Sequence, residues 1–258
     1  MSHLKVAYLR EHAFNSRWWG APVGIVDSPD FFTLTKEERA QQLEAWAWVE
    51  FQTDLDRIPD ARCMAEDGFH PVDTQLRFRI PLTKVPQSAA CAGMEVHDAE
   101  TSPSYFESRR AKSFGNERFV SLPGATQEIV DRRYALWSDQ VIRDFPRTCL
   151  ALTLNDEVQG WFLARPLSES RIELTLAMTA QESSIDGYAL YHQAMLTYAR
   201  SGWHLGEAGF SATNTAVHNI YAALGARFLT PKICFRRTAR RAAIVSPHPG
   251  RDGGQRTG

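Results

Sequence analysis

The sequence has few cysteines, and they lie far apart. Four cysteines occur in 258 residues, with no CxxC pair and no histidine at a metal-ligand spacing from them. This scarcity argues against a disulfide framework and against a zinc site, and it fits free thiols in a reducing cytoplasm. We therefore expect a cytoplasmic protein that uses no metal.

Long runs of one charge and long apolar runs are also missing. The formal net charge is −1 and no long basic run occurs, so we expect no nucleic-acid partner. The Arg-rich stretch at residues 236–241 is the exception. We interpret it as a solvated strand end, with attraction of an anionic ligand as the alternative. No apolar run approaches the length of a membrane span and the N-terminus lacks a signal-peptide pattern, so we expect no membrane partner.

The amino-acid composition is that of a folded protein. Hydrophobic residues make up 43% and charged residues 23%, which is enough apolar mass for a core. We divide the chain into an N-terminal unit (1–82), a small-residue linker that contains proline (83–102) and a second unit (103–240). Residues 241–258 hold prolines and glycines and little that packs, so we predict a disordered tail. The sequence leaves the oligomeric state open, a homodimer included.

The second unit alternates strand and helix signals. Asn155 and Asp156, at the reversal between two apolar runs, are a strong hairpin signal. The order of the elements predicts an α/β fold with a mixed sheet and helices on both faces. In chain order we predict a helix at 127–145, strands at 148–154, 158–165 and 172–179, a helix at 187–200, a strand at 205–211, a short helix after Asn214 and a strand at 227–237.

The N-terminal unit repeats part of the second unit at an offset of 157 residues. Six identities occur in 34 positions, among them Gly68 on Gly225, and the strand–helix–Gly–strand pattern is the same. Met64 takes the position of Tyr221, so the first copy lacks that hydroxyl. We therefore expect the first copy to shape a substrate cleft rather than to carry out chemistry.

Residues 213–228 are the most informative stretch of the chain. Asn214 is a typical helix N-cap residue, and Gly225 suits the left-handed position just past a helix end. Tyr221 follows Asn214 by seven residues, about two helical turns, so both lie near one face of the helix. A tyrosine on such an apolar face can also be a buried core residue.

This Asn-x6-Tyr-x3-Gly segment, followed by an aromatic residue and a strand, resembles the closing part of the GNAT acyltransferase superfamily. The resemblance implies a GNAT fold, here preceded by the partial GNAT-like N-terminal unit. It also implies acetyl-CoA or another acyl-CoA as co-substrate, with Asn214 holding the pantetheine arm. Tyr221 would protonate the leaving thiolate.

The resemblance places the pyrophosphate of the coenzyme at the start of the helix at 187–200, where free N–H groups and the helix dipole stabilise an anion. Ser184 replaces the arginine or glutamine of the family's loop, and Asp186 brings a carboxylate to an anion site. An acyl carrier protein is therefore the alternative donor, because its phosphopantetheine lacks the adenosine pyrophosphate. We expect the donor to contact Ile185, Gly187, Tyr188 and Ala189.

The strand at 172–179 would lie beside the pantetheine. In the family a backbone N–H near the end of this strand polarises the thioester carbonyl, and Met178 or its neighbour Ala177 is the candidate here. Glu173 is the candidate base for the incoming ammonium, directly or through water, and a solvent-facing strand residue is the alternative. Other candidate bases are Glu207, His192 and His218.

Further motifs concern the acyl acceptor. Residues 14–24, 116–119 and 134–137 resemble motifs of the dTDP-fucosamine acetyltransferases and their relatives, and the resemblance spans most of residues 13–237. It implies that the acceptor is a nucleotide-linked amino sugar. Trp18 and Trp19 would stack on its flat ring or fill the core.

The sequence thus predicts an N-acyltransferase that works by direct transfer to a primary amine of a small molecule, in surface-polysaccharide or natural-product biosynthesis. Two alternatives stay open. One is a binding module that keeps the fold but has lost turnover, and the other is a peptide or polyamine acetyltransferase.

Overall fold

The computed structural model describes residues 8–87, 93–107, 109, 111–112 and 118–239. They form two compact units: the first takes the described parts of Met1–Phe51, Pro59–His70 and Arg236–Gly258, and the second those of Gln52–Ile58 and Pro71–Phe235. The predicted disordered tail, residues 241–258, lies outside the described residues. Among the residues that are described, no helix is long and apolar enough to cross a membrane.

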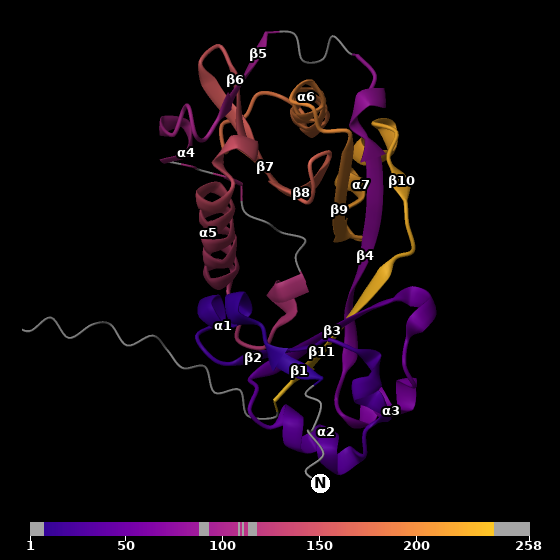
Figure 1. The fold of residues 1–258 in the computed structure, drawn as a ribbon. Coiled ribbons are helices and arrows are strands. Elements are labelled where there is room, and N and C mark those ends of the chain that lie inside the picture. Colours follow the sequence, from indigo (N-terminus) through magenta and orange to yellow (C-terminus); the bar gives the residue numbers. More distant parts are fainter. Residues whose placement is uncertain (1–7, 88–92, 108, 110, 113–117, 240–258) are drawn as a thin grey trace, which may run out of the picture. The chain divides into compact units, whose positions relative to one another are not determined.

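The second unit is built on a mixed sheet, as the sequence predicts (Figure 1). From β4 to β5 the neighbouring strands are antiparallel except β8 and β9, which are parallel. Asn155 and Asp156 have φ angles of 53° and 64°, which the tight hairpin between β6 and β7 requires. The strands lie in the order β4 (His70–Pro81), β9 (Leu205–Ser211), β8 (Arg171–Thr179), β7 (Glu157–Pro166), β6 (Cys149–Leu154) and β5 (Met94–Asp98), and β10 (Arg227–Phe228) pairs with β4.

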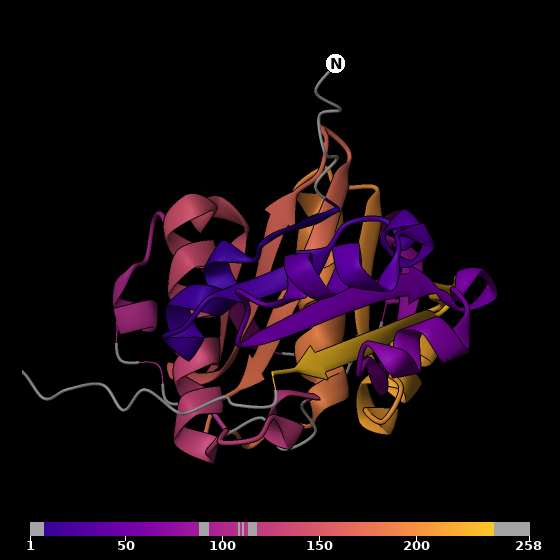
Figure 2. The same cartoon turned by 90° about the horizontal axis from the view of Figure 1, so that it is seen from below.

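Helix α5 (Gln127–Asp144) covers one face of this sheet (Figures 1 and 2). The thiol of Cys149 in β6 donates to the carbonyl of Val141 in α5. Leu150, the next residue along β6, belongs to a cluster on the other face, because successive strand side chains point to opposite faces. The helix predicted at 127–145 is therefore confirmed and defines one side of the unit.

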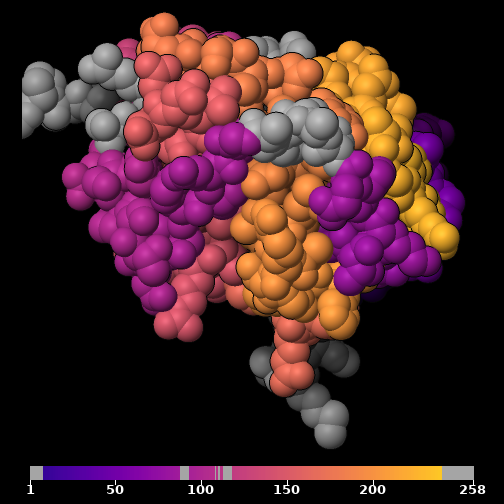
Figure 3. Space-filling model, turned by 90° about the horizontal axis from the view of Figure 1, so that it is seen from above, coloured from indigo at the N-terminus to yellow at the C-terminus, as the bar shows by residue number. Residues whose placement is uncertain are grey.

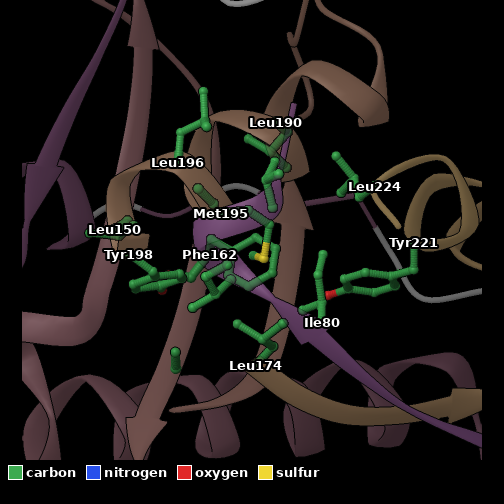
Figure 4. Packing of buried hydrophobic residues seen from close by; sticks show 14 of the residues in the cluster. Ile80, Leu150, Phe162, Leu174, Leu190, Met195, Leu196, Tyr198, Tyr221 and Leu224 are labelled. Carbon is green, nitrogen blue, oxygen red and sulfur yellow. The ribbon is translucent and has the colours of Figure 1, made fainter. Parts of the chain in front are cut away.

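Helices α6 (Gly187–Arg200) and α7 (Thr215–Ala223) cover the opposite face. The outer side of α6, seen from above, forms part of the surface of this unit (Figure 3). Their inner sides form a buried cluster with the sheet, and Figure 4 shows Leu190, Met195 and Tyr198 of α6 pointing into it. The Tyr198 hydroxyl donates to the carbonyls of Thr148 and Phe162, so this buried polar group is satisfied.

Two parts of the second unit differ from the sequence prediction. The strand expected at 227–237 is broken into β10 and β11 (Lys232–Thr238), and Pro231, which has no N–H for a ladder, stands between them. Within the predicted linker, residues 94–98 form β5, which pairs with β6, and α4 (Ser104–Glu107) follows. The remaining short 3₁₀ turns of this unit are η2 (Leu55–Arg57), η3 (Leu82–Lys84), η5 (Arg118–Ser121) and η6 (Pro146–Thr148).

The first unit is smaller and rich in aromatic side chains. Strand β1 (Leu9–Glu11) is antiparallel to β2 (Val23–Val26), and β2 is parallel to β3 (Trp48–Asp54), whose last residues pass into the second unit. Its core contains the rings of Phe31, Phe32, Phe51 and Phe69 in edge-to-face contacts. Its helices are α1 (Ala13–Trp19), η1 (Pro29–Thr33), α2 (Lys36–Leu43) and α3 (Ala61–Glu66).

The predicted repeat coincides with secondary structure at the same offset. Residues 48–54 form β3 and residues 205–211 form β9, while 70–81 form β4 and 227–238 span β10 and β11. The last strands are exchanged, however. Strand β4 of the first copy pairs with β9 in the second unit, and the end of β11 belongs to the first unit. The two units therefore do not follow the predicted boundary at residue 82.

A buried ion pair joins two helices of the first unit. The side chains of Arg39 in α2 and Asp67, just after α3, are only 6% and 5% exposed, and their N···O distance is 2.5 Å. Arg39 also donates to the carbonyl of Leu34. Burial by itself lowers the pKa of Arg39, but the hydrogen bond and the charge of Asp67 outweigh it and raise this pKa. The ion pair therefore keeps Arg39 protonated although its side chain is buried away from water.

We expect Arg39→Leu to destabilise the first unit by about 3–5 kcal/mol, because it leaves the Asp67 carboxylate buried without its cation. The measurement is urea unfolding followed by circular dichroism. Arg62→Leu is the matched control, since it removes the exposed pair with Glu66 in α3 and should cost under about 1 kcal/mol. Equal losses in the two variants would contradict the role assigned to the buried pair.

Candidate functional site

Strands β8 and β9 separate soon after they meet. They pair only at Arg171 with Leu205, Ile172 with Gly206 and Glu173 with Glu207. Beyond that point β8 stays paired with β7, and β9 stays paired with β4. The facing edges of β8 and β9 are thus free of each other, so their backbone groups can pair with a ligand.

A bulge interrupts β8 just beyond this separation. Leu174 pairs with Ala164 and Leu176 pairs with Leu163, which leaves Thr175 without a partner on β7. The extra residue reverses the alternation of the side chains. Leu174 accordingly packs in the α6–α7 cluster, whereas Met178 faces α5. No glycine marks this bulge, and no residue pattern around Thr175 indicates it.

The register also decides between the two predicted oxyanion donors. Ala180 donates its N–H to Gln159 of β7, while the carbonyl of Thr179 accepts from Lys112 on the other edge. Because backbone groups of successive strand residues point to opposite edges, Met178 faces β7 and Ala177 faces the edge that β9 has left. The geometry therefore favours the N–H of Ala177 over that of Met178.

The start of α6 is capped by Asp186. Its carboxylate accepts from the N–H of Ala189 at 2.8 Å, so it lies at the helix N-terminus as an anion would. The described part of the chain offers no acceptor for the N–H groups of Gly187 and Tyr188. A Cβ atom on Gly187 would lie 3.2 Å from Ile220, so the close approach of α7 is one reason for this glycine.

Gln159 was missed by the sequence analysis and fixes the loop before α6. Its side chain is buried, with 1% exposed, and its Oε1 accepts from the N–H of Ser184 at 2.8 Å and from the Ser184 hydroxyl at 3.1 Å. Ile185, the next residue, packs against the α6–α7 cluster. Ser184 thus has a structural partner at the position where the family carries a longer polar side chain.

Asn214 caps α7, as predicted, and accepts from the N–H of Val217 at 3.2 Å. The amide NH₂ group of Asn214 stays able to donate to a ligand. Gly225 ends the turn after the helix with a φ angle of 83°. Cap and glycine together set the length and direction of α7 and hence the position of Tyr221.

The Tyr221 side chain is only 4% exposed and lies among aromatic rings. Its ring centroid is 4.0 Å from that of Phe78 and 5.2 Å from that of Tyr191. In Figure 4 its hydroxyl points toward Ile80, into the cluster. Burial raises the pKa of Tyr221 well above its ordinary value, so the hydroxyl stays protonated at neutral pH.

No described residue hydrogen-bonds the Tyr221 hydroxyl, in contrast to the hydroxyl of Tyr198. The hydroxyl oxygen is not among the buried side-chain atoms that lack a partner in the described part of the chain, so it is not fully closed off from solvent although the ring is buried. A ligand or water can therefore reach it.

Glu173 lies at the point where β8 and β9 separate, beside Glu207. Glu173 forms an ion pair with Arg165, and Glu207 forms one with Arg171 at 2.5 Å. Each carboxylate therefore already has a guanidinium partner. His192 is buried, and its Nε2 lies 2.5 Å from the carbonyl of Pro86, so it is part of the core rather than an open base.

The two predicted acceptor residues belong to the first unit, whereas the other predicted site residues belong to the second. Trp18 is 1% exposed, and its Nε1 donates to the Asn15 side chain at 2.9 Å. Trp19 is half-buried and packs edge-on against Trp18 and Trp48. This packing favours the core-filling alternative for Trp18 and leaves part of Trp19 accessible.

A pocket of about 370 Å³ lies in the second unit between α4, α5 and the end of β8. Polar and charged side chains dominate its lining, and Met178 adds an apolar surface. In the described parts of the chain, no group of three or more His, Cys, Asp or Glu side chains is placed to hold a metal. The lining residues are Glu107, Arg109, Ala111, Lys112, Asp131, Tyr134, Ala135, Ser138, Met178 and Gln181.

Comparisons with known proteins agree with this architecture. No protein-family model matches the sequence, and no curated protein matches it. A GCN5-related N-acetyltransferase from Sphaerobacter thermophilus aligns with a TM-score of 0.57 and 17% identity, over 87% of this chain and 74% of its own. One from Kribbella flavida aligns with a TM-score of 0.50 and 12% identity, over 84% and 81%.

A conserved protein of unknown function from Staphylococcus epidermidis ATCC 12228 aligns with a TM-score of 0.52 and 11% identity, over 87% of this chain and 88% of its own. Identities this low establish the fold alone. The chain therefore has the fold of the GCN5-related N-acetyltransferases, the GNAT fold.

Proposed function

We propose that this protein is an N-acyltransferase that moves an acetyl or other small acyl group from coenzyme A to a primary amine of a small molecule. The observation that carries the proposal is the separation of β8 from β9 beside the capped starts of α6 and α7. When the pantetheine arm of an acyl-CoA lies along the free edge of β8, the thioester carbonyl lies near N–H groups of that edge. The thioester sulfur then lies near the Tyr221 side chain.

The donor is held by backbone groups and by the two helix starts. The edge of β8 that β9 leaves, up to Met178, pairs with the amides of the pantetheine arm, because the carbonyl of Thr179 on this edge already accepts from Lys112. The NH₂ group of Asn214 donates to one of the pantetheine carbonyls. The N–H groups of Gly187 and Tyr188, together with the helix dipole, bind the pyrophosphate. Asp186 opposes this binding by up to about 1 kcal/mol, as exposed like charges do.

The carboxylate of Asp186 is also a reason to retain an acyl carrier protein as the alternative acyl donor. A phosphopantetheine arm on an acyl carrier protein lacks the adenosine pyrophosphate and needs less of the α6 N-terminus. The capping carboxylate at that N-terminus is the observation that favours this alternative.

The reaction is a direct transfer. The neutral amine attacks the thioester carbon, the new C–N bond forms and the C–S bond breaks. The N–H of Ala177 stabilises the oxyanion, with the N–H groups beside the Thr175 bulge as further donors. Glu173 or a water takes the proton of the amine, and Tyr221 gives its proton to the thiolate.

The acceptor suggested by the sequence is a nucleotide-linked amino sugar, with a peptide or polyamine as the alternative. A GNAT-fold module without turnover is the competing function of another class. The burial of the Tyr221 ring in the aromatic cluster favours that module, and the hydroxyl oxygen, which is not closed off from solvent, opposes it.

Acetyl-CoA at about a hundred times its dissociation constant should raise the melting temperature by roughly 5–10 °C, because it adds about 2.7 kcal/mol. Asp186→Asn keeps a capping side chain and removes the charge, so it should tighten binding by up to about fivefold. Asp30→Asn, at an exposed position, is the control. A rise with the adenosine-free pantetheine thioester alone would instead favour the carrier-bound donor.

Tyr221→Phe should lower kcat at least about a hundredfold, the contribution expected of a general acid, with the affinity for acetyl-CoA unchanged. Thiol release from acetyl-CoA measures the rate, and calorimetry measures binding. Tyr198→Phe is the matched control: it deletes a buried, hydrogen-bonded hydroxyl, so it should lower stability without changing kcat. An unchanged kcat in Tyr221→Phe would remove the proposed acid and favour the binding module.

A further inference from the structure

We propose that the pocket between α4, α5 and the end of β8 takes a small amphoteric molecule, one that carries both an ammonium and an anionic group. The inference rests on the proposed function, because it names the acceptor of the same site. The proposed acceptor is an amine that also carries a carboxylate or a phosphate a few bonds away.

The position of the pocket links it to the transferred acyl group. Met178 lines the pocket from the α5 face of β8, and its neighbour Ala177 carries the N–H that faces the edge left by β9. An amine in this pocket therefore reaches the thioester from the face opposite to α6 and α7, which hold the donor. The two substrates approach the reacting carbon from different sides of the sheet, as direct transfer requires.

The pocket volume is comparable to that of small-molecule sites. A volume of about 370 Å³ is near the lower end of the range of small-molecule sites, roughly 300–1,000 Å³. Such a space suits an amino acid or a single sugar ring. A nucleotide attached to the sugar would have to extend outside it.

Lys112 supplies the positive charge. Its N–H donates to the carbonyl of Thr179 at 3.0 Å, and Ala111 bridges to Ala180, so its backbone is fixed beside the end of β8. Its ammonium has no ion-pair partner among the described residues. Arg109, the other cation of the lining, is already engaged with Asp139 and with the carbonyl of Phe106. Lys112 is thus the lining cation available to an anionic group of the ligand.

Two carboxylates line the pocket, and the exposed one, Glu107, supplies the opposite charge. Asp131 of α5 accepts from the Gln127 side chain at 2.9 Å, which fixes its orientation. Glu107, at the end of α4, is exposed at the pocket rim. A simple anion would be repelled by Glu107, and a simple monoamine would leave Lys112 without a partner. A molecule with both charges satisfies both sides.

The test compares matched acceptors in the acetyl-CoA reaction of the full chain. One pair is β-alanine and its methyl ester, and the other is glucosamine 6-phosphate and glucosamine. In at least one pair the anionic member should have about tenfold higher kcat/KM, as a charge-assisted hydrogen bond gives. The pair that shows the preference identifies the anion. No preference in either pair would overturn the inference.

Lys112→Met should remove this preference by lowering kcat/KM for the anionic member alone. Lys84→Met, at an exposed lysine of η3, should leave both members unchanged. Glu107→Gln should weaken both members of a pair, since both carry the ammonium. A Lys112→Met variant that keeps the preference would also overturn the inference.

Binding without a donor separates this inference from the proposed function. Saturation-transfer NMR of β-alanine and glucosamine 6-phosphate, in the absence of acetyl-CoA, should show binding that depends on Lys112. If that binding is present and no acyl transfer occurs, the pocket assignment stands and the proposed function fails. If acyl transfer occurs equally well with neutral amines, the proposed function stands and the pocket assignment fails.

Discussion

The separation of β8 and β9 is the constraint on which the site depends. Two strands can diverge inside a sheet only if each keeps a partner on its outer edge, because unpaired backbone groups are costly in a protein interior. Here β7 holds β8, and β4 holds β9. Gly206 allows the close contact where the strands are still paired, since a Cβ atom there would lie 3.0 Å from both Ile80 and Leu174. The bulge at Thr175 then turns β8 away.

The strand exchange gives the first repeat a part in this site. Its last strand, β4, supplies the outer partner of β9, and Phe78 of β4 packs directly against Tyr221. The first copy has Met64 in place of Tyr221 and so offers no equivalent acid. Its contribution to the second unit is a strand and an aromatic wall. That the first copy shapes a substrate cleft rather than carries out chemistry stays a prediction.

What the sequence could predict were the features set by local interactions. The bounds of α6, the cap at Asn214 and the glycine after α7 depend on residues a few positions apart, and they were predicted correctly. The bulge in β8, the role of Gln159 and the choice of Ala177 over Met178 depend on which strand lies beside which. Single-sequence periodicity carries no such information. Strand β5 was missed because it directly follows the small-residue segment that favoured a linker.

The N-terminal caps of α6 and α7 show how strongly the carboxylate of Asp186, at the predicted pyrophosphate site, affects donor binding. Both helices are capped by their own side chains, α6 by a charged one and α7 by a neutral one. A cap contributes about 1 kcal/mol, so a pyrophosphate that displaces Asp186 loses about fivefold in affinity. The free edge of β8 and the NH₂ group of Asn214 offer several hydrogen bonds to the pantetheine, each worth about 1 kcal/mol. In the proposed donor site, this balance favours recognition of the pantetheine arm over recognition of the adenosine end.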